Sequence, residues 1–185
     1  MPIHLSLKRL SFLGINKFKL DFPNFEVERS FTKFFVETLT QNSDGRLNKL
    51  SSQLIHRLNT NDLAQFCSIL EKLFAHIPYT LIKKQEDFYH ILFQFLLSLL
   101  SLESQSEIIT NKGRIDLVIS TSIHIYIFEF KLNSTPEIAL AQIKQRGYYQ
   151  RFLHHGKNVV LVGLSFTSKD DEFQLKYIQE NIRNS

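Results

Sequence analysis

Apolar residues in the first eighty positions recur at intervals of three and four, which is the spacing of helices that bury one face. Residues 26–40 show this pattern, and a second helix is predicted from Leu47 to Leu58. A third helix follows, because Asn61 or Asp62 can cap its first turn and an apolar stripe continues behind them. The pattern therefore predicts a small helical region over residues 1–80.

Residues 81–185 change to a pattern in which helices alternate with strands. A mostly apolar helix is predicted over 84–102. Short links of two or three residues join the strand-like runs that follow, as antiparallel hairpins require. These runs are Ser106–Thr110, Arg114–Ser120 and Ile123–Leu132.

Two further helices and one buried strand complete the predicted α/β fold. The first helix should begin at Pro136, run to about His154 and end at Gly156. Val159–Phe166 is continuously apolar, so it should be a strand buried on both faces, and the helix before it indicates parallel pairing. A charged helix over Lys169–Arg183 should close the chain.

The alternation along Ile123–Leu132 brings charged residues to an apolar face. Glu129 and Lys131 share that face with isoleucines, and both faces of the strand look buried. The short hairpin that precedes this strand should bring Asp116 of the neighbouring strand close to Glu129. Buried charges of this kind are costly unless they are paired, bound to a metal or opened into a cleft.

Two chemical interpretations of Asp116, Glu129 and Lys131 are compatible with the residues alone. Two carboxylates that converge on one point repel each other, and a divalent cation relieves that repulsion. Mg²⁺ suits such a site because it takes oxygen ligands and bridges to phosphate. A buried ion pair between Glu129 and Lys131 is the other interpretation, and the pattern does not decide between them.

Composition and charge narrow the class of protein only slightly. The formal net charge of +4 is compatible with a polyanionic partner but does not indicate one. The single cysteine, Cys67, cannot form an internal disulfide. The N-terminus has no signal-like apolar run, and the most apolar segment is too short and too polar to span a membrane. A cytoplasmic location is expected.

Several short motifs follow one another in order over about residues 84–166. The two central motifs are Gly113–Val118 and Ile127–Leu132. The accompanying motifs are Phe88–His90, Ser106-Glu107, Ala139–Lys144 with Gly147-Tyr148, and Val159–Gly163. This series resembles the PD-(D/E)XK nuclease superfamily, and more narrowly the branch often found C-terminal to an AAA-ATPase-like domain. The resemblance implies a restriction-endonuclease-like core: a helix, a three-strand antiparallel meander, a helix, a parallel strand and a helix.

The resemblance also implies roles for individual residues. Asp116 and Glu129 would be metal ligands for Mg²⁺ or Mn²⁺, and Lys131 would be the catalytic lysine. The backbone carbonyl of Phe130 would be a further ligand, and either Glu86 or Glu107 would add an acidic one. Supporting positions for the site or for nucleic acid are Gln142, His90 and Arg114.

The implied activity is metal-dependent hydrolysis of phosphodiester bonds, with DNA as the expected substrate. A nuclease-fold module that binds nucleic acid or a partner protein without useful turnover is the alternative. Residues 20–27 resemble the segment that joins the ATPase-like domain to the nuclease domain in that branch. An ATPase-like domain or partner is therefore expected to act with this chain, and a homodimer stays open.

Overall fold

The computed structural model describes part of the chain in detail. Backbone is described for residues 10–12, 18–20, 46–75, 93, 97, 104–110, 113–169 and 172–182. Side chains are described for residues 48–75, 93, 97, 114–167 and 174–182. The predicted helix over residues 26–40 lies outside the described residues, as do all but two positions of the helix predicted over 84–102. Those two positions, Phe93 and Leu97, are helical and fully buried.

The chain divides into two compact units, Met1–Leu47 and Asn48–Ser185. In the first unit, strands β1 (Leu10–Phe12) and β2 (Phe18–Leu20) pair antiparallel. The second unit contains the sheet and the helices that carry the candidate site. The predicted division near residue 80 is not tested by these features and stays a prediction.

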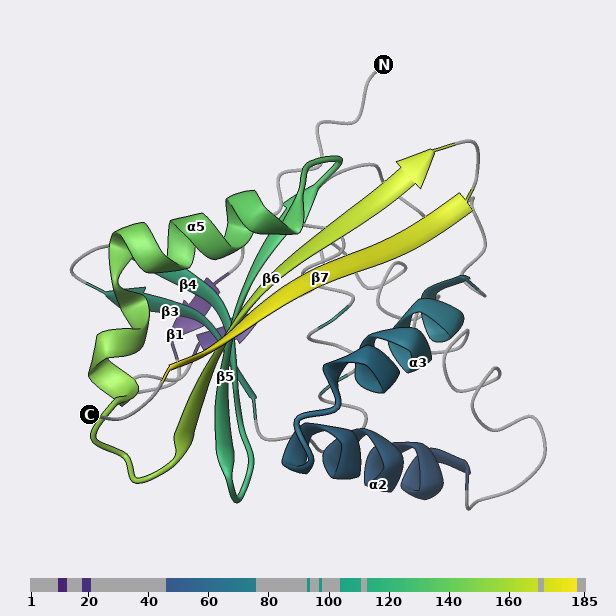
Figure 1. Ribbon diagram of the computed structural model, residues 1–185, viewed down its shortest axis with the longest axis horizontal. Coiled ribbons are helices and arrows are strands. Elements are labelled where there is room, and N and C mark those ends of the chain that lie inside the picture. The colour runs from purple at the N-terminus through teal and green to yellow at the C-terminus, as the bar shows by residue number, and fades with distance from the viewer. Residues whose placement is uncertain are drawn as a thin grey trace. The chain divides into compact units, whose positions relative to one another are not determined.

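Helices α2 (Arg46–Asn59) and α3 (Leu63–Ala75) confirm the two predicted helices of this region (Figure 1). Asp62 is the residue that caps α3, since its Oδ1 accepts a hydrogen bond from the backbone N–H of Gln65 at 3.2 Å. The other carboxylate oxygen of Asp62 lies 3.0 Å from Arg57 Nη1. Asn61, the other capping candidate, instead adopts a left-handed conformation with φ 54° in the turn between the helices.

A five-stranded sheet in the order β3-β4-β5-β6-β7 forms the centre of the second unit. Only β5 and β6 pair in parallel. The bounds are β3 Ser104–Thr110, β4 Gly113–Ser120, β5 His124–Leu132, β6 Asn158–Lys169 and β7 Glu172–Ile182. The predicted meander, the parallel strand and the α/β class are thereby confirmed, and the arrangement is consistent with a restriction-endonuclease-like core.

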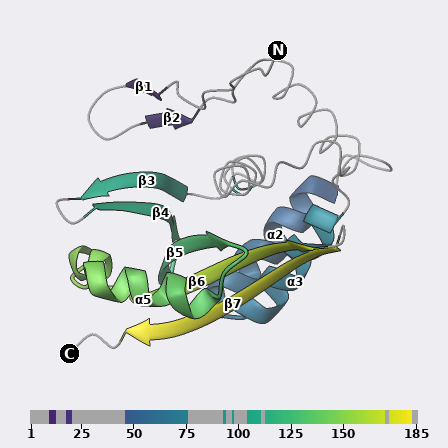
Figure 2. The same cartoon turned by 90° about the horizontal axis from the view of Figure 1, so that it is seen from above.

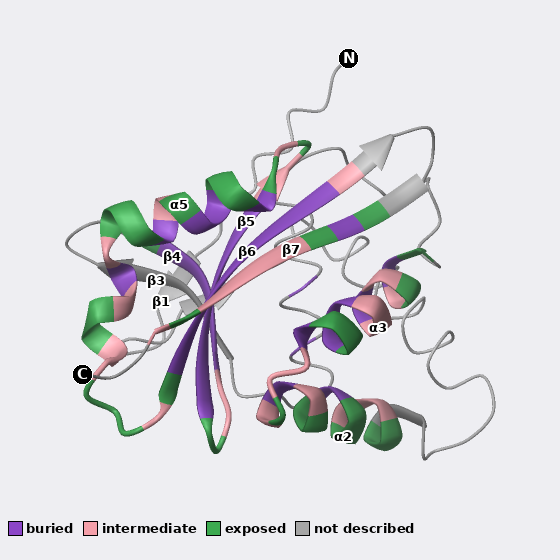
Figure 3. Cartoon of the chain, viewed as in Figure 1, coloured by how far each residue is buried: buried purple, intermediate pink, exposed green. Residues whose placement is uncertain are grey.

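The two faces of the sheet are covered by different helices (Figure 2). Helix α5 (Pro136–Arg146) packs Leu140 and Ile143 against isoleucines and valines of β4, β5 and β6. On the opposite face, an aromatic cluster joins helix α3 and Phe93 to the sheet, with ring centroids 5.2–6.4 Å apart. Its members are Phe66, Phe74, Phe93, Phe128, Phe130 and Phe166. Strands β4, β5 and β6 are consequently buried along most of their length (Figure 3).

The predicted C-terminal helix over Lys169–Arg183 is wrong, because this segment forms strand β7. It pairs antiparallel with β6 from Lys169↔Glu172 to Val159↔Ile182. Leu175 is buried while its neighbours Gln174 and Lys176 are exposed, which is the alternation of a strand. β7 carries many polar residues because it is an edge strand of the described sheet.

The helix predicted to run from Pro136 to His154 is shorter than expected. Helix α5 ends at Arg146, and Gly147 follows in the left-handed conformation with φ 62° and ψ 29°. The N–H of Gly147 donates to the carbonyls of Ile143 and Lys144, which closes the helix. A 3₁₀ helix, η2 (Tyr148–Phe152), continues the chain toward β6, so Gly156 ends no α-helix.

Candidate metal site at the open ends of strands β4 and β5

The candidate site lies where the paired residues of β4 and β5 end. The last pair in their ladder is Leu117↔Phe128, although both strands continue beyond it. At the next position, Asp116 Oδ2 accepts a hydrogen bond from the backbone N–H of Phe130 at 2.9 Å. The carboxylate of Asp116 thus replaces a backbone contact between the strands. This bond holds Asp116 beside Glu129, as the hairpin in the sequence predicts.

Glu129 is a nearly fully buried carboxylic acid, with 1% of its surface exposed. Burial first, and then the nearby charge of Asp116, raise its pKa to about 8, although the charges of Lys131 and Arg146 oppose the shift. Its Oε1 receives a hydrogen bond from Gln142 Nε2. Its Oε2 is buried and has no hydrogen-bond partner. An unsatisfied buried oxygen is costly, so this atom is suited to a ligand that the protein itself does not supply.

Lys131 follows Glu129 on the same face of β5. Its Nζ lies 3.6 Å from Glu129 Oε1, and its side chain is about one-fifth exposed while that of Glu129 is almost fully enclosed. The ammonium therefore stands between the buried carboxylate and solvent. The ion-pair interpretation describes this contact correctly. It does not account for Oε2 of Glu129 or for the second carboxylate, Asp116.

Gln142 reaches the site from helix α5, and the close approach of this helix depends on Gly163. Gly163 is the β6 residue paired with Glu129. A Cβ atom at Gly163 would lie 2.1 Å from the carbonyl oxygen of Pro136 and 2.7 Å from the backbone nitrogen of Leu140. These two atoms are four residues apart in the first turns of α5. Only glycine lets the helix lie this near the strand, and so lets Gln142 contact Glu129.

For the other predicted site residues the structure gives fewer contacts or none. Arg114 is exposed on β4. Glu107 falls between the paired positions Ser106↔Leu117 and Ile108↔Ile115, so its backbone lies opposite Asp116 in the ladder. The side chain of Glu107 is outside the described residues, and so are Glu86 and His90 entirely. The carbonyl of Phe130 stays a predicted ligand.

Arg146 is a residue that the sequence did not single out. It is exposed at the end of α5, and its charge acts on Glu129, where it opposes the effects of burial and of Asp116 on the pKa. Its Nη1 donates to the hydroxyl of Tyr148 at 3.1 Å. The sequence feature that could have identified Arg146 is its spacing of four residues from Gln142, since residues four apart lie on one face of a helix.

The oxygen donors of this site fit a hard divalent cation such as Mg²⁺ or Mn²⁺. Asp116 and Glu129 would hold it, and the unsatisfied Oε2 of Glu129 is the observation that supports this fit. Within the part of the chain that the structure describes, no group of three or more His, Cys, Asp or Glu side chains could hold a metal ion. Among the described residues, Asp116 and Glu129 are therefore the two acidic side chains of the candidate site.

Comparison with known proteins agrees with the motif resemblance. Residues 84–174 match the model of the PD-(D/E)XK nuclease superfamily. The chain therefore carries a PD-(D/E)XK nuclease superfamily domain over these residues, which include every predicted site position. Proteins of this superfamily are typically metal-dependent nucleases.

A relative from Azotobacter chroococcum mcd 1, described as an uncharacterized protein in the vnfD 5′ region, is 27% identical over 187 residues. The alignment covers 97% of this chain and 36% of the relative, so the chain spans about a third of the relative's length. No solved structure matches the chain. Among the described helices, none has the length and apolar content that crossing a membrane requires.

Proposed function

We propose that this chain is a metal-dependent nuclease that hydrolyses phosphodiester bonds in DNA, with Asp116, Glu129 and Lys131 as its catalytic residues. The observation that carries the proposal is the state of Glu129. This carboxyl group is enclosed beside a second carboxylate, and its Oε2 has no hydrogen-bond partner. An oxygen without a hydrogen-bond partner does not stabilise an ion pair between Glu129 and Lys131. A cation site, by contrast, requires an oxygen that is available to the metal. The superfamily match over residues 84–174 supports the same activity.

The chain's own groups have distinct tasks in this reaction. Asp116 and Glu129 hold the cation, while the N–H of Phe130 fixes Asp116 and Gln142 fixes Glu129. A bound divalent cation supplies positive charge against the phosphate oxygens and makes water more acidic. The ammonium of Lys131, on the solvent side of Glu129, orients the attacking water and offsets negative charge on the phosphate.

A third acidic ligand is proposed to come from Glu107 or Glu86. The register of β3 on β4 favours Glu107, because its backbone lies opposite Asp116. Glu107→Gln and Glu86→Gln variants distinguish the two, since only loss of the true ligand weakens binding of Mn²⁺ in a calorimetric titration.

The alternative function is a nuclease-fold module that binds nucleic acid or a partner protein without turnover. The observation that favours it is the presence of only two carboxylates in the described part of the site. In either case an ATPase-like domain or partner is proposed to act with this chain. The greater length of the Azotobacter relative, of which this chain covers 36%, leaves room for such a domain.

The test is cleavage of linear and circular DNA in Mg²⁺, Mn²⁺ or EDTA by the wild type, Lys131→Ala and Asp116→Asn. We expect cleavage by the wild type with metal, and loss of at least about a hundredfold in both variants. Wild type and variants that bind DNA equally and are equally inert would support the binding module instead. Cleavage that persists in Asp116→Asn would place the reaction elsewhere in the protein.

A further inference from the structure

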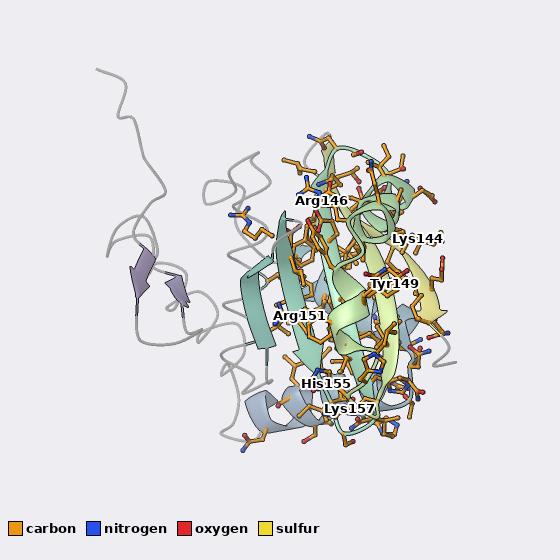
Figure 4. The ribbon with its side chains drawn as sticks, turned by 90° about the vertical axis from the view of Figure 1, so that its left-hand side faces the viewer. Lys144, Arg146, Tyr149, Arg151, His155 and Lys157 are labelled. Carbon is orange, nitrogen blue, oxygen red and sulfur yellow. The ribbon has the colours of Figure 1, made fainter. Side chains whose placement is uncertain are left out.

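The connection from helix α5 to strand β6 is basic throughout. Residues 138–169 contain no Asp or Glu, although they include several Lys, Arg and His. Four of these basic residues follow one another in Figure 4, and we call them the basic flank. Its members are Arg146, Arg151, His155 and Lys157. Lys144 lies to the side in the same view, toward β7.

The two arginines of the basic flank have no carboxylate partner among the described residues. Arg146 and Arg151 are exposed, and no described carboxylate lies within salt-bridge distance of either. The Nζ of Lys157 donates to Ser120 Oγ at 2.8 Å and to the carbonyl of Thr121 at 2.5 Å. Lys144 differs, because its Nζ lies 2.9 Å from Glu180 Oε2.

One end of the basic flank reaches the candidate metal site. Arg146 lies one helical turn after Gln142, which donates to Glu129, and the charge of Arg146 acts on Glu129 as well. A polyanion that follows the flank would therefore arrive at the carboxylates. The flank has the position that a substrate-binding surface requires.

The aromatic residues of the flank show which form of polyanion fits. Tyr149 is half-buried and packs against the hydrophobic core, so its ring is not open for stacking. The ring of Phe152 is also half-buried, with the Arg151 guanidinium 5.4 Å above it and the His155 ring 6.1 Å away. Proteins that hold single strands offer open aromatic platforms to the bases. The flank offers positive charge without such a platform, which suits a continuous phosphate backbone.

We infer that the basic flank binds the phosphate backbone of duplex DNA and leads it to the site at Asp116 and Glu129. This inference rests on the proposed function, because it names the surface through which that site receives its substrate. Arg146 and Arg151 provide the principal phosphate contacts. Their guanidinium groups can donate two parallel hydrogen bonds to phosphate oxygens, and each contact releases condensed counterions.

The experiment compares two double variants that change the net charge equally. Arg146→Gln/Arg151→Gln removes the exposed, unneutralised charges. Arg57→Gln/Lys144→Gln removes two charges that are paired with Asp62 and Glu180. Both are made in a Lys131→Ala background, so that cleavage does not disturb the measurement. Binding of a fluorescein-labelled 20-base-pair duplex is followed by anisotropy from 50 to 200 mM salt, beside the single strand of the same sequence.

We expect the flank variant to bind the duplex on the order of tenfold more weakly at 50 mM salt. Its plot of log affinity against log salt should be shallower by about 1.8, or about 0.9 for each lost phosphate contact. The control variant should match its parent. Arg146→Lys/Arg151→Lys should recover the salt slope, because the slope depends on charge rather than on guanidinium geometry, and this recovery excludes a folding defect.

Three results would overturn the inference: equal weakening in both double variants, an unchanged salt slope in the flank variant, or tighter binding of the single strand than of the duplex. The cleavage assay is independent of these measurements. Metal-dependent cleavage by the wild type together with an unchanged slope would refute the flank and leave the proposed function intact. If the flank variant has a shallower slope but the wild type cleaves DNA in no metal, the proposed function is refuted and the flank stands as a DNA-binding surface.

Discussion

Neutralising Glu129 should stabilise the metal-free protein, and the gain should grow as the pH rises. Glu129→Gln keeps the size of the side chain and the oxygen that accepts from Gln142, but it removes the ionisable carboxyl group. In the folded protein, burial first and then the charge of Asp116 raise the pKa of Glu129 from its ordinary value of 4.5 to about 8. The unfolded chain retains the ordinary value.

The difference in bound protons between the folded and unfolded states decides whether the free energy of unfolding rises or falls with pH. Between pH 4.5 and 8 the folded protein keeps the Glu129 proton while the unfolded chain has lost it, so unfolding releases a proton. Stability from this group is therefore fully present below pH 4.5 and is lost as the pH rises toward 8. Each unit of pH within this window corresponds to about 1.36 kcal/mol. From pH 5 to pH 7 the loss amounts to about 2–3 kcal/mol.

The assay is urea unfolding of wild type and Glu129→Gln in EDTA at pH 5, 6 and 7. The free energy of unfolding of the variant minus that of the wild type should increase by about 2–3 kcal/mol across this range. Taking the difference removes the titration of every shared group that does not interact with Glu129. An increase is the expected result because only the wild type must keep on Glu129 a proton that the unfolded chain gives up as the pH rises.

Glu137→Gln is the matched control. Glu137 is exposed in the first turn of α5, and a hydrogen bond from its own backbone N–H, followed by one from the Thr135 side chain, lowers its pKa. A lowered pKa stabilises the protein above the unfolded value of 4.5, and that stability is lost only as the pH falls below it. The control difference should therefore stay nearly constant from pH 5 to 7. A constant difference for Glu129→Gln as well would refute the argument that Glu129 is buried as an acid.

Further predictions concern the metal, the lysine, the helix contact and the cap. Mg²⁺ should raise the melting temperature of the wild type but not that of Glu129→Gln, because binding to the folded state alone stabilises it; equal shifts would contradict the assigned ligand. Lys131→Met should keep this Mg²⁺ response while losing cleavage by at least about a hundredfold, and loss of both together would make the lysine structural. Gly163→Ala should cost about 1–3 kcal/mol in urea unfolding, since the new methyl group meets the backbone of α5, and a neutral result would show that the helix moves freely. Asp62→Ala should cost about 1 kcal/mol in urea unfolding through loss of the α3 cap, and a neutral result would show that the cap contributes nothing.

The sequence determined the elements whose pattern is set by local chemistry. Alternation along β5 placed Glu129 and Lys131 on one face, and the short turn before it placed Asp116 nearby. The continuous apolar run of β6 indicated burial on both faces, which only a central strand has. These features follow from residue order because the side-chain period of a strand and the length of a hairpin leave few alternatives.

The sequence failed where an element depends on what lies beside it. The polar residues of β7 resemble a surface helix, and the pairing of this strand with β6 is a long-range choice made by the sheet edge. In the structure, Glu71 of α3 accepts a hydrogen bond from the backbone N–H of Leu175 at 3.0 Å, a contact across 104 positions. Helix α5 was also predicted too long, because the helical spacing of apolar residues continues past Gly147 while the α-helical backbone conformation ends there.

The chemistry of the site divides in the same way. Residue types and spacing identified Asp116, Glu129 and Lys131 but left a metal site and an ion pair open. Tertiary structure decided that Glu129 is enclosed, that its Oε2 has no partner, and that Gln142 reaches it because Gly163 admits the helix. Burial and close approach are properties of packed elements, and packing brings together residues that the sequence keeps far apart. Spacing can therefore name the charged residues, whereas only the fold sets the pKa of Glu129 and the direction from which α5 covers it.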